Sequence, residues 1–84
     1  MPVLARFYGI VIRMYFLGPE HNPPHIHAIY GEDAAALDIR TGEIIDGHLP
    51  KRAASLVREW MGPYREELLT MWETQEFKKL ESLE

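Results

Sequence analysis

The chain has 84 residues, of which 46% are apolar and 11% aromatic, with a formal charge of -4 and no cysteine. This composition excludes a disordered chain and a disulfide framework, and the length fits one domain, residues 1–84, around one core. The negative charge argues against duplex DNA as a ligand of this chain alone, because DNA-binding proteins usually present a basic face.

The first residues, Met1 to Arg6, have no signal-peptide organisation. The apolar stretches, such as residues 9–12, are far too short to span a bilayer. We therefore expect a cytoplasmic protein without a membrane role. A domain this small buries only about 60 to 65% of the surface of its unfolded chain, so a homodimer or another partner would add stability.

Aromatic and branched side chains dominate residues 5–17, which are predicted to form one long strand buried on both faces. Gly9 within this stretch indicates a bulge, a bend or a break. Residues 18–24 contain three prolines and predict a stiff turn, because proline cannot join a hydrogen-bonded ladder. Residues 25–30 and 34–39 are predicted to pair as a hairpin.

A fourth, short strand is expected at residues 43–46. From Pro50 the apolar residues fall at helical spacing, and Gly62-Pro63 is expected to end one helix and begin another. Residues 78–84 form either a docked or a frayed tail. The predicted fold class is α+β: an antiparallel sheet of three to four strands followed by two helices packed on one face.

Three of the four histidines lie in one seven-residue motif, His21-Asn22-Pro23-Pro24-His25-Ile26-His27. Residues two apart on a strand point the same way, so His25 and His27 are expected on one face with Cβ atoms about 6 to 7 Å apart. Imidazole serves as a proton carrier, a metal ligand or a phosphate contact. The motif therefore predicts a site without specifying its chemistry.

Three interpretations of the motif remain open. His21, His25 and His27 could bind Zn²⁺ or Ni²⁺, with a nearby acid such as Glu20, Glu32 or Asp38 completing the site. The histidines could instead contact a ligand or act as catalytic groups without a metal. In the third interpretation they are structural, with His25 and His27 solvated and His21 bonded to the turn.

Arg13 is the second informative residue, because a charge among aromatic and branched side chains is usually paired or used. If the first two strands are neighbours, its guanidinium could lie beside His25 and His27. Two imidazoles as acid and base, with an arginine stabilising the developing negative charge, suit phosphodiester chemistry. The alternative is an ion pair of Arg13 with Asp38 or Asp46.

Three segments, residues 6–16, 21–27 and 49–53, together resemble a small bacterial domain-of-unknown-function family, the one numbered 4160. The resemblance extends from Met1 to about Leu83, with a departure at residues 17–20, where the family commonly has a shorter polar turn. It implies one half of a two-gene pair, suspected of toxin-antitoxin function, without agreed catalytic residues. The motif positions that it carries over are Arg13, His21, Asn22, His25 and His27.

From these features we expect a toxin-like component of a two-gene toxin-antitoxin-type module. His25, His27 and Arg13 are the predicted catalytic residues for RNA cleavage, and His21 and Asn22 are predicted to contact the ligand. The alternatives are a noncatalytic metal-binding module and a protein-interaction or regulatory module. The expected partners are a small cognate protein from a neighbouring gene, RNA and a second copy of the chain. The cofactor is left open, with Zn or Ni under the metal-binding alternative.

Overall fold

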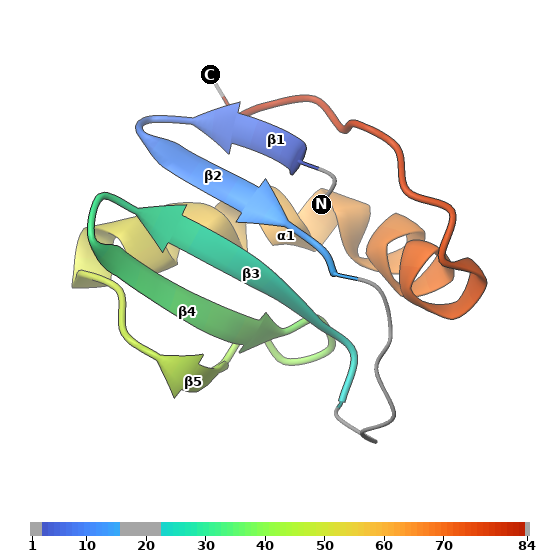
Figure 1. Cartoon of the computed structure of the whole chain (residues 1–84), viewed down its shortest axis with the longest axis horizontal. Helices are drawn as coiled ribbons and strands as arrows, with labels where there is room; N and C mark the ends of the chain where they lie inside the picture. The colour runs from blue at the N-terminus through green and yellow to red at the C-terminus, as the bar shows by residue number, and fades with distance from the viewer. Residues whose placement is uncertain (1–2, 16–22, 84) are drawn as a thin grey trace.

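The structure is a computed structural model, and it describes residues 3–15 and 23–83. Within these residues five strands precede one helix along the chain: β1 (Val3–Phe7), β2 (Ile10–Arg13), β3 (His25–Tyr30), β4 (Asp33–Asp38), β5 (Ile44–Gly47) and α1 (Lys51–Thr74). The strands form one antiparallel sheet in chain order, and α1 lies across one face of it (Figure 1). The predicted α+β class and antiparallel sheet are confirmed, and the predicted hairpin of β3 with β4 is present.

The number of strands differs from the prediction because the described part of the expected long strand over residues 5–17 contains a hairpin in place of one continuous strand. The chain turns at Tyr8 and Gly9, and β1 pairs with β2. Both turn residues have positive φ, 48° at Tyr8 and 79° at Gly9, as in the two-residue turns that match the twist of a hairpin. Tyrosine rarely adopts this conformation, so Gly9 is the only turn signal in the sequence. The turn also places the side chain of Phe7 in the core, on the opposite face of the sheet from Arg13.

The two predicted helices are wrong, because α1 runs through Gly62 and Pro63 without a break. A proline usually disfavours the helical conformation of the residue before it by a clash with that residue's Cβ. Gly62 has no Cβ, and both residues are exposed. Water can therefore reach the backbone carbonyl that loses its hydrogen bond to the proline. No helix of the described residues is both long and apolar enough to cross a membrane.

The core lies between the sheet and α1. Its largest fully buried side chain is Trp60, whose ring centroid lies 5.7 Å from that of Phe7. Other fully buried side chains come from the sheet and from α1: Leu4, Ile10, Ile12, Met14, Ile26, Leu37, Ile39, Val57, Met61 and Leu68. Burial of each such side chain stabilises the fold by about 1.5–3 kcal/mol relative to leaving it in water, so this layer holds the sheet on the helix.

The C-terminal segment, residues 75–83, folds back along α1 and β1 (Figure 1). The backbone N–H of Leu80 donates a 2.8 Å hydrogen bond to the carbonyl of Leu4, and the indole N–H of Trp60 donates one of 2.8 Å to the carbonyl of Glu81. We call residues 75–83 the docked tail. Because it bonds to β1, it covers part of an edge strand that would otherwise offer free backbone groups.

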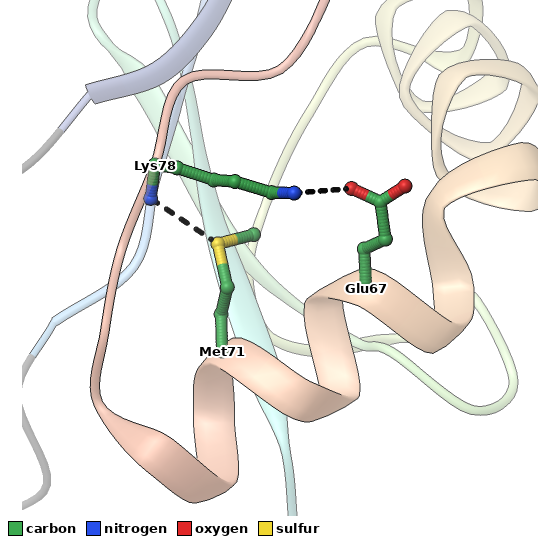
Figure 2. A network of polar contacts seen from close by, with 3 residues as sticks. All are labelled: Glu67, Met71 and Lys78. Carbon is green, nitrogen blue, oxygen red and sulfur yellow. Dashed lines mark hydrogen bonds and ion pairs between the residues drawn. The ribbon is translucent and has the colours of Figure 1, made fainter.

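Figure 2 shows how the docked tail also contacts α1. The ammonium nitrogen Nζ of Lys78 lies 3.3 Å from Oε2 of Glu67, and the backbone N–H of Lys78 donates to the sulfur of Met71 at 3.4 Å. The apolar side chains Phe77 and Leu80 pack against the core. The docked tail is thus attached by apolar, backbone and ionic contacts.

Candidate functional site

His25 and His27 lie at the start of β3, on the face of the sheet opposite the core residue between them. That residue, Ile26, is fully buried against α1, whereas both histidines are half-buried. The two imidazole ring centroids are 5.0 Å apart, with an angle of 69° between the ring planes. The alternation of a strand therefore brings the two imidazoles into contact, and we call the sheet face that they share the outer face.

The ring of His25 is oriented by its own motif. Its Nδ1 lies 2.8 Å from the carbonyl oxygen of Pro23. A carbonyl can only accept, so Nδ1 bears the hydrogen, and Nε2 of the neutral ring keeps a free lone pair. The indole of Trp72, near the end of α1, stacks at an angle on the same ring with a centroid distance of 4.9 Å. Nε2 of His25 is therefore the atom available for a proton, a metal or a ligand.

His27 has a different environment from His25. Its ring meets the ring of Tyr15 edge-on, with centroids 4.3 Å apart and an interplanar angle of 87°. Burial lowers the pKa of His27 below the usual 6.5, the nearby His25 lowers it further, and Asp46 acts in the opposite direction. His27 is thus a neutral imidazole at neutral pH, which is the form that accepts a proton.

Arg13 lies directly opposite His27 in the pairing of β2 with β3. Side chains in such a pair have Cβ atoms about 4.5–5.5 Å apart and share a face of the sheet. The Nε of Arg13 is buried and has no hydrogen-bond partner among the described residues. Arg13, Tyr15, Val11 and Ile29 line a shallow depression on the outer face beside His27.

The ion pair considered for Arg13 with Asp38 or Asp46 is not formed in the described part of the chain. The carboxylate of Asp38 instead accepts hydrogen bonds from the backbone N–H groups of Arg40, at 2.7 Å, and Thr41, at 3.3 Å. Asp38 therefore stabilises the turn after β4. Asp46 lies further across the outer face, where it acts on His27.

Two members of the predicted metal set, Glu20 and His21, lie outside the described residues, as does Asn22, which was predicted to contact the ligand. Among residues 3–15 and 23–83, no three side chains of the metal-binding types converge closely enough to hold an ion. The structure therefore brings together Arg13, His25 and His27 from the predicted site.

Two contributors to this site were not predicted from the sequence, the carbonyl of Pro23 and the ring of Trp72. The strand period alone predicts that Tyr15 shares the face of Arg13, because the two residues are two positions apart on an extended segment. The contact of His25 with the Pro23 carbonyl is local, since the two residues are two positions apart. Trp72 contacts His25 from 47 positions away, and no local pattern in the sequence indicates that contact.

The family model described as Domain of unknown function (DUF4160) matches residues 9–73. The matched span includes every residue of the site described above: Arg13, Tyr15, Pro23, His25, His27, Asp46 and Trp72. No curated protein and no solved structure matches the chain.

Proposed function

The chain belongs to the DUF4160 family, and on that premise we propose that it cleaves RNA by acid–base catalysis as the toxin-like half of a two-protein module. The observation that supports this proposal is the pair of imidazoles on β3 with unlike environments, 5.0 Å apart and facing Arg13. General acid–base catalysis needs one group that accepts a proton and one that donates it.

In the proposed reaction His27 is the base, because its lowered pKa keeps it neutral at neutral pH. It takes the proton of a ribose 2′-hydroxyl, and the 2′-oxygen forms a bond to the adjacent phosphorus. His25 in its protonated form has a second N–H at Nε2, and it gives this proton to the 5′-oxygen as the bond from phosphorus to that oxygen breaks. The products are a 2′,3′-cyclic phosphate and a free 5′-hydroxyl.

Arg13 has the electrostatic role in this proposal. Negative charge accumulates on the phosphoryl oxygens while five oxygens surround the phosphorus, and a guanidinium opposite His27 stabilises that charge. Its Nε is buried and has no acceptor among the described residues, so in the proposed complex the guanidinium turns its N–H groups toward a phosphate oxygen. A partner protein that neutralises the toxin would have to cover this part of the outer face.

The test uses protein purified without a histidine tag, because a tag would add imidazoles. The substrate is a short RNA with a fluorophore and a quencher, and its all-DNA counterpart lacks the 2′-hydroxyl. We expect cleavage of the RNA alone, leaving a 2′,3′-cyclic phosphate. Replacing His25 or His27 by alanine should reduce the rate about 10²–10⁴-fold, as expected for loss of an acid or base.

The matched control is His48→Ala, which removes an exposed imidazole outside the motif and should leave the rate unchanged. Equal cleavage by the His25→Ala, His27→Ala double variant, or equally strong growth arrest on its induced expression, would show that the histidines are not the active site. Stoichiometric zinc or nickel in the purified protein, lost in the double variant, would replace this proposal by the noncatalytic metal-binding alternative.

A further inference from the structure

We propose that the outer face beside His27 is a nucleotide subsite, in which Val11 and Ile29 hold a base while Arg13 and Arg6 hold the phosphates on either side of it. The inference deepens the proposed function and rests on it for the identity of the substrate. Its geometry comes from side chains that the histidine motif does not include.

Two rows of side chains cross the outer face next to one another. In each row the members are cross-strand partners, so they share a face of the sheet. The first row consists of Arg13, His27, Ala36 and Asp46, from β2 to β5. The second row consists of Arg6, Val11, Ile29 and Ala34, from β1 to β4.

Charge divides the outer face into two halves. Arg6 on β1, Arg13 on β2 and the imidazoles of β3 lie in one half, whereas Asp38 on β4 and Asp46 on β5 lie in the other. The carboxylate of Asp38 is bonded to the turn after β4, and Ala36 separates His27 from Asp46. An anionic ligand is therefore expected over β1, β2 and β3, although the whole chain has a charge of -4.

An apolar floor adjoins both arginines, since Val11 is the cross-strand partner of Arg6 and lies two residues from Arg13 on β2. Val11 and Ile29 are direct partners on β2 and β3, and both are half-buried and line the depression with Tyr15 and Arg13. The two rows are two residues apart along the strands, which corresponds to about 7 Å at a rise of 3.3–3.4 Å per residue. That spacing suits one nucleotide, with its flat base on the floor and its phosphate at Arg13.

The unpartnered Nε of Arg13 favours an anion over a purely apolar ligand. A buried N–H without an acceptor is unfavourable, and a phosphate oxygen is a strong acceptor for a guanidinium. The body of α1 is on the opposite side of the sheet (Figure 1), and of its residues Trp72 reaches the ring of His25, away from Val11 and Ile29. A single-stranded RNA could thus lie flat on the outer face, whereas a duplex would bury its bases away from the floor.

The test uses a labelled 2′-O-methyl RNA trinucleotide, which binds as RNA but has no free 2′-hydroxyl to react. Binding is measured by fluorescence anisotropy and by backbone amide NMR shifts, with inorganic phosphate as a second probe. We expect the trinucleotide to shift the amides of Val11, Arg13 and Ile29. Phosphate alone should shift those near Arg13.

The diagnostic variant is Val11→Thr with Ile29→Thr, which keeps branched side chains that suit a strand but makes the floor polar. It should weaken trinucleotide binding about tenfold, the effect of roughly 1.4 kcal/mol, and leave phosphate binding unchanged. Ile45→Thr is the matched control, because it makes the same change at an exposed isoleucine of β5. Arg13→Gln should weaken the binding of both the trinucleotide and phosphate, and it serves as the test if the double threonine variant does not fold.

The outcomes separate this inference from the ribonuclease proposal. Trinucleotide binding without cleavage of an unmodified RNA would overturn the ribonuclease and leave the subsite standing. Cleavage together with equal trinucleotide affinities for the threonine pair and the Ile45→Thr control would overturn the subsite alone. Shifts confined to the start of α1, or no binding of the trinucleotide, would also overturn it.

Discussion

Arg13 and His27 are direct cross-strand partners on the outer face, with Asp46 beyond them in the same row. A guanidinium, an imidazole and a carboxylate thus follow one another across the sheet, separated only by Ala36. The small side chain of Ala36 allows Asp46 to influence His27. The pKa of His27 therefore depends on its burial, on His25 of its own strand and on Asp46 of β5.

The first prediction concerns the titration of His27. In NMR spectra of the imidazole Cε1–H groups, His27 should titrate below 6.5, because burial and His25 lower its pKa. Asp46→Asn should lower the pKa of His27 further by removing the one opposing charge. His25→Ala should raise it. A midpoint for His27 at or above 6.5 in the unmodified protein would contradict this account.

The second prediction follows from the same shift and concerns the free energy of unfolding. Because the pKa of His27 is lower in the folded protein than in the unfolded chain, the unfolded chain takes up the proton first as the pH falls below 6.5. Stability should therefore decline from pH 6.5 down to the folded pKa of His27 and then level off for this group. Urea unfolding at a series of pH values should show a smaller decline for His27→Gln, and an identical decline would refute the prediction.

The histidine pair illustrates what the sequence does predict. A shared face for His25 and His27 follows from the strand period alone, and so does the hairpin of β3 with β4. The turn at Tyr8 was missed because a positive φ is rare for tyrosine. The continuation of α1 through Pro63 was missed because a proline inside a helix lacks the N–H of the helical hydrogen bond. The contact of His25 with Trp72 depends on the packing of the whole helix.

The third prediction separates stability from function at Arg13. Arg13→Met keeps the apolar stem and removes a buried donor that has no partner among the described residues. A buried donor without an acceptor lowers the free energy of unfolding by about 1–3 kcal/mol, so the melting temperature of Arg13→Met should equal or exceed that of the unmodified protein. RNA cleavage should fall about 10²–10³-fold, as on removal of one group that stabilises transition-state charge.

The control for this substitution is Arg6→Met, which changes an exposed arginine of the outer face. Its stability should stay within about 0.5 kcal/mol of the unmodified protein, as for most surface changes. A clear loss of stability in Arg13→Met would show that the guanidinium is a structural group, contrary to the role proposed for it.

The fourth prediction compares two glycines with positive φ. Gly31 has a φ of 61° and open space around it, whereas a Cβ at Gly47, with a φ of 79°, would run into the carbonyl oxygen of Ala34. Gly31→Ala should cost about 1–2 kcal/mol from its backbone conformation alone. Gly47→Ala should cost at least about 1 kcal/mol more, because β4 and β5 would have to separate. Equal losses in thermal unfolding would mean that β5 adjusts without strain.

The last prediction asks which contacts hold the docked tail. Lys78 and Glu67 form an ion pair in which the Lys78 side chain is 65% exposed and the Glu67 side chain 47% exposed. Such exposed ion pairs contribute about 0–1 kcal/mol to the free energy of unfolding, because water and salt screen them. A double-mutant cycle of Lys78→Ala and Glu67→Ala should give a coupling below about 1 kcal/mol that disappears in high salt. Leu80→Ala should destabilise by about 1–2 kcal/mol through lost packing, independently of salt.

Trp60→Phe supplies the matching test of the polar attachment, because it keeps an aromatic core residue and removes the hydrogen bond to the carbonyl of Glu81. The loss of this hydrogen bond should lower the free energy of unfolding by about 1 kcal/mol. Amide hydrogen exchange at residue 80 should then be faster in Leu80→Ala and Trp60→Phe than in Lys78→Ala, since packing and the hydrogen bonds to Leu4 of β1 and from Trp60 of α1 hold the docked tail in place. The reverse order, with the fastest exchange in Lys78→Ala, would identify the ion pair as the main attachment.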